Sequence, residues 1–261
     1  LAFGGTLGAA ELKARSAAEV DEARLILGTG GLQLDAGDTT KALGLGTAAA
    51  ASFGGQTGIA AANGVVLSAS AVDALLTRSE ITSQGGIGAN ATRRQALTGL
   101  AFQATVASNG VGVGGALGLA RDRGVTTAAA RGATLDASFD VTIRAHNDTD
   151  VTTSAAGGSY GSNFSLAGSS SLTLKEDVVL AEIDGGGVNA GDAVLVEAAS
   201  AGGLGAVGGG DEGALGSIDQ LTGSVSLSSS IATGISVGII RSVADVDAAI
   251  RGGASVAARA E

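Results

Sequence analysis

Apolar and small polar residues alternate in short runs throughout this chain. Such alternation is the pattern of a β-strand with one buried face, because successive side chains point to opposite sides of a sheet. We therefore expect the apolar members of each run to face a core and the Ser, Thr, Asp and Arg residues to face solvent. The apolar members of the clearest runs are Leu32 and Leu34, Val141 and Ile143, Leu172 and Leu174, Val194 and Val196, Val225 and Leu227, and Ile235, Val237 and Ile239.

One segment also has the composition of a helix. Residues 9–27 are rich in Ala, Glu, Lys and Arg, which are good helix formers. The same segment alternates, with Leu12 and Ala14 on one side and Lys13 and Arg15 on the other. Because the alternation continues that of the rest of the chain, we interpret this segment as a strand.

A block of similar sequence recurs along the chain. A fixed period is typical of stacked repeats without a single compact core. The last interval is longer, which indicates an irregular insertion at about residues 202–223. Copies of the block begin at Val20, Val72, Val125, Val178 and Val246, so that the intervals are 52, 53, 53 and 68 residues.

Pairs of glycines separate the runs at about half the block length, for example at residues 30–31, 54–55 and 85–86. Glycine readily adopts the positive φ of a sharp corner, so we expect about two coils per block. The sequence thus predicts an all-β fold, a parallel β-helix of roughly ten short-stranded coils. Stacked at ~4.8 Å, the coils would form a rod on the order of 50 Å long. Residues 1–261 would be one β-helical segment of a longer chain, with strand edges exposed at both ends.

The composition agrees with a long, narrow core. The chain has 45 Gly, five Phe, one Tyr and no Trp, so Val, Ile, Leu and Ala must fill the interior. The absence of Pro argues against collagen-like and polyproline structures, and a hydrophobic content of 45% argues against disorder. Without Cys, the chain forms neither disulfides nor thiolate metal sites.

The charge bears on partners. A formal net charge of −10 argues against binding to nucleic acid, which requires a basic stripe, and against docking on an anionic membrane. The chain also has no apolar stretch long enough for a helix to span a bilayer. We therefore expect neither a nucleic-acid partner nor membrane insertion.

Several segments resemble a family of bacterial exoproteins. Residues 234–250, 58–73 and 110–120 are similar to the repeats of leukotoxin-type filamentous adhesins, which are related to the filamentous-haemagglutinin and autotransporter proteins. The turns at residues 253–256 and 132–135 resemble the Gly-Ala-x-Val turn of those repeats, the second with Leu135 in the last position. The resemblance implies a right-handed β-helix, type V secretion and an extracellular or cell-surface location. It brings no catalytic residues with it.

Candidate chemical groups are few. His146 is the only histidine, and we expect it to be a solvent-facing turn residue, because one His without Cys cannot form a zinc site by itself. No Gly-x-Ser-x-Gly elbow precedes a helix, as a Ser-His-Asp hydrolase would require. Calcium is the remaining alternative, through oxygen atoms of residues 147–150, Asp184 or residues 211–212, although neither an EF-hand nor a β-roll repeat occurs. We predict no catalytic, cofactor or metal residues.

Three further segments have ordinary structural interpretations. The glycines of residues 110–118 suggest a phosphate cradle, but no Gly-Lys-Ser/Thr follows, so we expect small residues packed at corners. Arg93-Arg94 and residues 121–123 are short charged groups that we expect on the outer face.

These observations predict a structural or adhesive segment of a secreted β-helical exoprotein, not an enzyme. Its expected partners are further coils of the parent chain, like rods end to end, or a glycan or protein of a cell surface. One alternative is a self-assembling extracellular filament or sheath subunit. Another is a polysaccharide-active enzyme or phage-type spike, which requires grouped carboxylates one coil apart in a groove.

Overall fold

The computed structural model describes residues 1–54, 57–201, 203–204 and 217–259, and every regular element in them is a β-strand. No helix that could span a membrane occurs in this part of the chain. The strands form three parallel sheets that extend side by side. We call them sheets A, B and C in the order in which the chain enters them.

Sheets A and C consist of long strands, and sheet B of short ones. Sheet A contains β1 (Ala2–Asp21), β4 (Thr57–Thr77), β7 (Val111–Arg131), β10 (Phe164–Asp184) and β15 (Ile231–Arg251). Sheet B contains β2 (Arg24–Leu27), β5 (Glu80–Ser83), β8 (Thr134–Ala137), β11 (Gly187–Ala190) and β16 (Ser255–Ala258). Sheet C contains β3 (Leu32–Ser52), β6 (Ile87–Ala107), β9 (Val141–Gly161), β12 (Val194–Ala201), β13 (Gly203–Leu204) and β14 (Ser217–Leu227).

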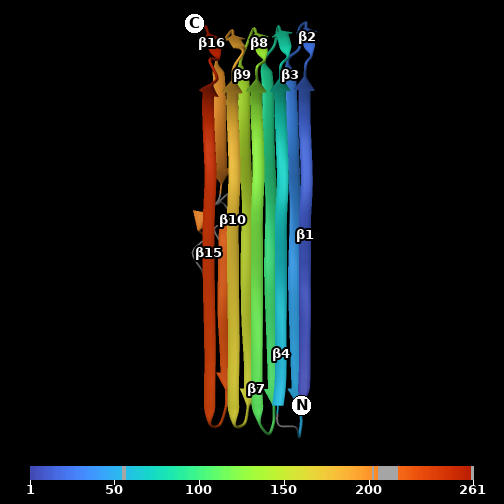
Figure 1. The fold of residues 1–261 in the computed structure, drawn as a ribbon, viewed down its shortest axis with the longest axis vertical. Helices are drawn as coiled ribbons and strands as arrows, with labels where there is room; N and C mark the ends of the chain where they lie inside the picture. Colours follow the sequence, from blue (N-terminus) through green and yellow to red (C-terminus); the bar gives the residue numbers. More distant parts are fainter. Residues whose placement is uncertain (55–56, 202, 205–216, 260–261) are drawn as a thin grey trace.

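Each coil therefore takes one long strand of sheet A, one short strand of sheet B and one long strand back in sheet C. In Figure 1 the strands of sheet A face the viewer, run upward and follow one another from right to left, with the return strands behind them. This path makes the coil right-handed. The predicted parallel β-helix is confirmed.

The number and shape of the coils differ from the prediction. One block forms one coil, and each sheet A or sheet B ladder has five strands where ten short-stranded coils were expected. A strand such as β4 has 21 residues and is roughly 70 Å long at 3.3 Å per residue, whereas five coils at 4.8 Å cover only about 24 Å. The glycines at residues 30–31, 54 and 85–86 do lie between strands, as expected, but they mark successive turns of single coils, so the inference of two coils per block was wrong. Other pairs, such as Gly114-Gly115 and Gly157-Gly158, lie inside strands β7 and β9.

The core lies where all three sheets meet. Beside sheet B, large apolar side chains such as Leu76, Ile81, Leu135 and Ile143 are 0–1% exposed. The short strands hold sheets A and C apart at this end, and the space between them suits Leu and Ile. The predicted inward orientation of Leu32, Leu34, Val141 and Ile143 is confirmed here.

Toward the other end of the long strands, sheets A and C pack directly on each other. A Cβ added to Gly44 would lie 2.2 Å from the carbonyl oxygen of Val65, and one added to Gly46 would lie 2.1 Å from that of Asn63. The interior here holds mainly Ala, Ser, Thr and Gly, including the cluster of Ala60, Ala62, Ala101, Ala116 and Ala155. The larger side chains of Val66, Leu97 and Val151 are buried only at the boundary with the wider half. No larger apolar side chain fits between the backbones at the glycine positions.

The predicted orientation is therefore wrong in this half of the molecule. Thr173 is 0% exposed and faces the interior, so the neighbouring Leu172 and Leu174 face outward. Val225 and Leu227 are 63% and 58% exposed. The same holds for Ile235, Val237 and Ile239, which are 54%, 47% and 53% exposed.

The segment with helical composition forms β1 and β2, as the alternation predicted. The predicted insertion at 202–223 is partly a strand, because Ser217–Leu227 forms β14 and pairs with β9. In this coil β12 and β14 together replace one long strand of sheet C. The rest of the predicted insertion, residues 202 and 205–216, lies outside the described residues.

Candidate interaction surface

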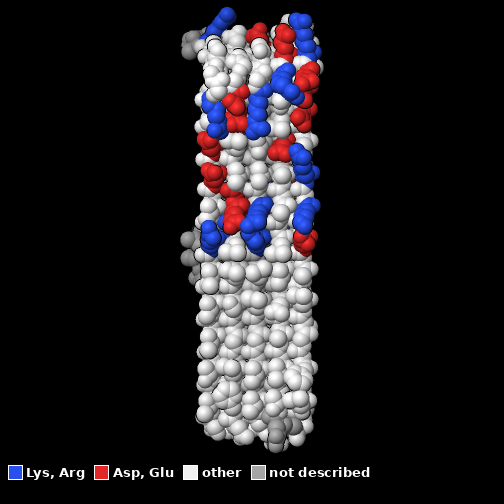
Figure 2. All heavy atoms as spheres, in the orientation of Figure 1, with Lys and Arg blue, Asp and Glu red and all other residues white. Residues whose placement is uncertain are grey.

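Charged residues are confined to one half of the long strands. Glu11, Leu67, Arg121, Leu174 and Arg241 lie in one row across sheet A. On the side of this row away from sheet B, no strand of sheet A carries a charge. Figure 2 shows the boundary as a change from coloured to white atoms halfway along the molecule. We call the white part the uncharged half.

The uncharged half recurs in every coil of the sequence. It corresponds to residues 1–10, 42–66, 97–120, 151–173 and 220–240, none of which is Asp, Glu, Lys or Arg. Each internal segment runs down a strand of sheet C, through a turn, and up the next strand of sheet A. Both outer faces of the molecule therefore lack charge over about ten residues, or roughly 33 Å.

Large apolar side chains cover these outer faces. On the inner strands β6, β7 and β9, Phe102, Leu117 and Tyr160 are 41%, 37% and 44% exposed. Patches of this kind on a water-soluble surface mark contacts with another molecule. Other exposed members of the uncharged half are Leu1, Phe3, Leu7, Leu43, Leu45, Phe53, Val106, Leu221, Val225, Leu227, Ile231, Ile235, Val237 and Ile239.

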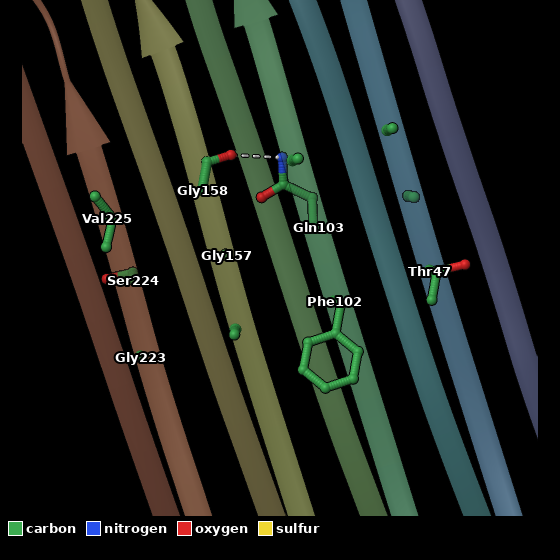
Figure 3. A pocket seen from close by; sticks show the side chains of 12 residues that line it. Thr47, Phe102, Gln103, Gly157, Gly158, Gly223, Ser224 and Val225 are labelled. Carbon is green, nitrogen blue, oxygen red and sulfur yellow. Dashed lines mark hydrogen bonds between the residues drawn. The ribbon is translucent and has the colours of Figure 1, made fainter.

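The face of sheet C is hollowed within the uncharged half. A groove of about 760 Å³ crosses four strands and is lined by residues 47–49, 102–104, 156–158 and 223–225. In Figure 3, Phe102 is the one aromatic ring among the residues that line the groove, whereas Gly157, Gly158 and Gly223 contribute no side chain. None of the lining residues is charged, so the groove suits an apolar partner.

Polar groups inside the uncharged half bond to one another. The hydroxyls of Thr153 and Thr173 are 2.6 Å apart, and the Ser226 hydroxyl donates to Ser165 Oγ at 2.8 Å. Gln103 Nε2 donates to the carbonyl oxygen of Gly158 at 3.0 Å, the bond drawn in Figure 3. These bonds satisfy the polar groups between sheets A and C, while the larger apolar side chains lie on the outer faces of the sheets.

A buried ion cluster lies just on the sheet B side of the uncharged half. Arg93 and Asp122 are 0% exposed, and Arg93 Nη1 donates to Asp122 Oδ2 at 2.9 Å. Arg93 also donates to Ser70 Oγ at 2.6 Å, to Gln95 Oε1 at 2.6 Å and to Thr149 Oγ1 at 3.0 Å. The expected outer-face position of Arg93 is therefore wrong, whereas Arg94 on the next position is exposed.

Asp177 and Lys175 complete the cluster. Lys175 Nζ lies 3.3 Å from Asp177 Oδ2, and Arg93 Nη1 lies 3.5 Å from Asp177 Oδ1. Burial raises the pKa of Asp177 to about 6, against the opposing effect of Lys175, and the carboxylate of Asp122 raises it further. The cluster has no solvent access in the described residues, which suits a structural role.

The other candidate residues lie in strands instead of turns. His146 is half-buried in the first third of β9, pairs in register with Ala199, and lines a hollow with Arg144 and Glu197. Arg144 bonds Glu197 at 3.1 Å. The predicted turn at residues 147–150 is also part of β9, with Asn147 and Thr149 buried beside Arg93.

Residues 121–123 are divided between the buried cluster and the outer face. Asp122 belongs to the buried cluster, while Arg121 and Arg123 face outward and both reach Glu176 Oε2, at 3.4 and 2.8 Å. Gly110 lies in the turn before β7, and the rest of residues 110–118 form the start of that strand, so most of these small residues are not at a corner. Asp184 ends β10. Asp211 and Glu212 lie outside the described residues, and the described ones contain no group of three or more His, Cys, Asp or Glu that could hold a metal.

Both ends of the coil stack expose strand edges. Within the described residues β1 pairs only with β4, and β15 only with β10. Each therefore has one side of its backbone without a strand partner. Such edges are templates for pairing with a further strand.

Sequence reasoning missed the uncharged half, although a signal was present. The charge-free stretches recur with the period of the block, and their outward apolar residues follow the same alternation.

Comparisons with protein-family models, with curated proteins and with solved structures give no match for this chain.

Proposed function

We propose that this chain is a structural, adhesive segment of a β-helical bacterial exoprotein that extends from a cell surface. In this role the coils stack on further coils, either of the parent chain or of like copies. The observation that carries the proposal is the pair of open edges at β1 and β15, which lie at opposite ends of one parallel ladder. A parallel coil added at either edge would extend the same register.

The resemblance to leukotoxin-type filamentous adhesins supports the same function and adds type V secretion and an extracellular location to the proposal. The outer faces are the surfaces that a glycan or protein of another cell would meet. The polysaccharide-active alternative requires grouped carboxylates, and the groove on sheet C is lined by uncharged residues. An extended scaffold is therefore the function that this surface supports best.

The alternative of a self-assembling filament or sheath subunit uses the same edges, with a second copy as the next coil.

One pair of variants tests edge stacking. Gly185 N donates to the carbonyl oxygen of Arg251 at 3.0 Å, so Arg251 and every second residue before it bond toward β10. Val243 belongs to that set, whereas the backbone N–H of Ala244 faces the open edge.

Proline removes the N–H and blocks pairing at one position. Ala244→Pro is expected to keep the fold and to stop end-to-end growth, measured as particle length by electron microscopy and as mass by light scattering. Val243→Pro is the matched control, since it removes a bond to β10 and should lower the melting temperature. Elongated stacks of unchanged length from Ala244→Pro would contradict edge stacking.

A further inference from the structure

We propose that the uncharged half is a packing surface for a second copy of this chain, which lies face to face against it. The proposal rests on the structural function above and adds a lateral contact to the end-to-end one. The contact joins outer apolar side chains of one copy, such as Leu117 of sheet A or Phe102 of sheet C, to those of the next. The uncharged halves overlap, and the charged halves stay in solvent.

The size of the surface fits a stable contact. Five strands at 4.8 Å and about ten residues at 3.3 Å give a face of roughly 800 Å². Specific protein interfaces bury about 800 Å² on each partner. One outer face of the uncharged half is therefore large enough by itself, and the molecule has two such faces.

The flatness of the sheets points to stacking. In Figure 1 the long strands run straight and nearly parallel from one end to the other. Adjacent strands ordinarily rotate by about 20–25°, and flat sheets of many strands are stabilised when other sheets stack on them. Sheets A and C stack on each other inside the molecule, and their outer faces present a second flat surface of the same kind.

The distribution of charge also suits a second copy. Across sheet A, charged side chains begin only at the row of Glu11, Arg121 and Arg241. A contact limited to the uncharged half therefore buries no charge, and burial of unpaired charge is the largest cost in such contacts. Interface cores are depleted of charged residues in the same way.

A lipid bilayer is the competing occupant, because the uncharged half is roughly 33 Å tall and a hydrocarbon core is about 30 Å thick. The edges of β1 and β15 argue against it wherever no further coil covers them. In hydrocarbon, backbone groups on these edges would lack any hydrogen-bond partner, and spanning structures do not tolerate open edges. A face-to-face protein contact leaves the edges free for solvent or further coils.

Two substitutions on one strand test the proposal. Leu117 and Val125 both lie on the outer face of β7 and are 37% and 41% exposed, but only Leu117 is in the uncharged half. Leu117→Lys, and Phe102→Lys for the face of sheet C, place a charge in the contact. Val125→Lys is the matched control. Sedimentation equilibrium measures self-association, and circular dichroism confirms that each variant is folded.

We expect the unmodified chain to gain mass with concentration, and Leu117→Lys or Phe102→Lys to shift this association to at least tenfold higher concentration. Val125→Lys should leave it unchanged. A chain that stays monomeric, or equal effects of all three substitutions, would overturn the proposal. So would flotation with phosphatidylcholine vesicles in place of self-association, since it would identify lipid as the occupant.

The edge and face contacts are separated in the Ala244→Pro background. Association that persists there and is lost on adding Leu117→Lys supports the lateral contact. If Ala244→Pro abolishes all association, the lateral contact is wrong and edge stacking stands. If Ala244→Pro has no effect while Leu117→Lys dissociates the assemblies, edge stacking fails and the lateral contact stands.

Discussion

Gly64 of sheet A faces Leu100 of sheet C so closely that a Cβ on Gly64 would lie 1.8 Å from the Leu100 carbonyl oxygen. The two backbones are in contact at this point, with no side chain between them. Similar approaches recur from Gly99 to Leu119 and from Gly118 to Ser154, at 2.6 and 2.7 Å. Such contacts explain why the larger side chains of this half point outward.

Replacement of Gly64 by Ala should therefore force the sheets apart. We expect Gly64→Ala to lower the free energy of unfolding by about 3 kcal/mol, because the clashing atom is backbone and cannot rotate away. Urea unfolding followed by circular dichroism measures the change. Gly115→Ala is the control, since Gly115 lies on the outer face of β7 with nothing within 4 Å of an added Cβ. Equal losses for both variants would refute direct packing of the sheets.

Arg93 should be essential for the fold, unlike its neighbour. Arg93→Met leaves the buried carboxylates of Asp122 and Asp177 without their guanidinium, and breaking a buried ion pair in this way costs about 3–5 kcal/mol. Arg94→Met removes an exposed charge and should cost less than about 1 kcal/mol. The melting temperatures of the two variants give the comparison. A similar, small effect of both would place Arg93 at the surface.

The carboxyl of Asp177 should make stability depend on pH in the opposite sense to an ordinary paired carboxylate. Its pKa is raised to about 6 in the folded chain, above the ordinary value of about 3.9. Between these values the folded state holds the proton more often than the unfolded state. The contribution of this group to stability therefore falls as pH rises from about 4 to about 6, and is constant above that range.

The size of this effect follows from the two pKa values. A difference of about two pKa units corresponds to about 3 kcal/mol of unfolding free energy lost between pH 4 and pH 7. Asp177→Asn does not titrate and should lack this component. Chemical unfolding at several pH values, for the chain and the variant, measures it. Parallel pH profiles for both would show that Asp177 titrates at its ordinary value.

The sequence predicted the class of fold because alternation and period are local signals. Leu172 and Thr173 must lie on opposite sides of a strand whatever the rest of the chain does. Which side is inside depends on the distance between two sheets, and that distance is set by pairs such as Gly64 and Leu100 on different strands. No local pattern contains that information.

The register between the repeats could not be derived from the sequence either. The recurring Val residues suggested the register, but β7 pairs Val125 with Ala71 on one side and with Val178 on the other. Val72 is one position away from the suggested match and is 0% exposed, whereas Val125 is 41% exposed. A slip of one residue exchanges the inner and outer faces, so only the structure could fix the register.

The buried cluster was missed for a related reason. Arg93, Asp122 and Asp177 are far apart in the sequence and come together only when three coils stack. Each of them alone is a charged residue in an alternating strand, which is typical of a solvent-exposed position. The uncharged half, in contrast, could be read from the periodic charge-free stretches once the coil length was known.

Large apolar residues of the uncharged half face outward while their small neighbours face inward, except in the row next to the charged half, where Val66, Leu97 and Val151 are buried. Adjacent residues of β7 test this orientation most directly, because Ala116 is 5% exposed and Leu117 is 37% exposed. The chain has no cysteine, so Ala116→Cys and Leu117→Cys each introduce a single thiol. At high dilution, we expect a hydrophilic maleimide to label Leu117→Cys rapidly and Ala116→Cys only on unfolding. Rapid labelling of Ala116→Cys with protection of Leu117→Cys would contradict the account.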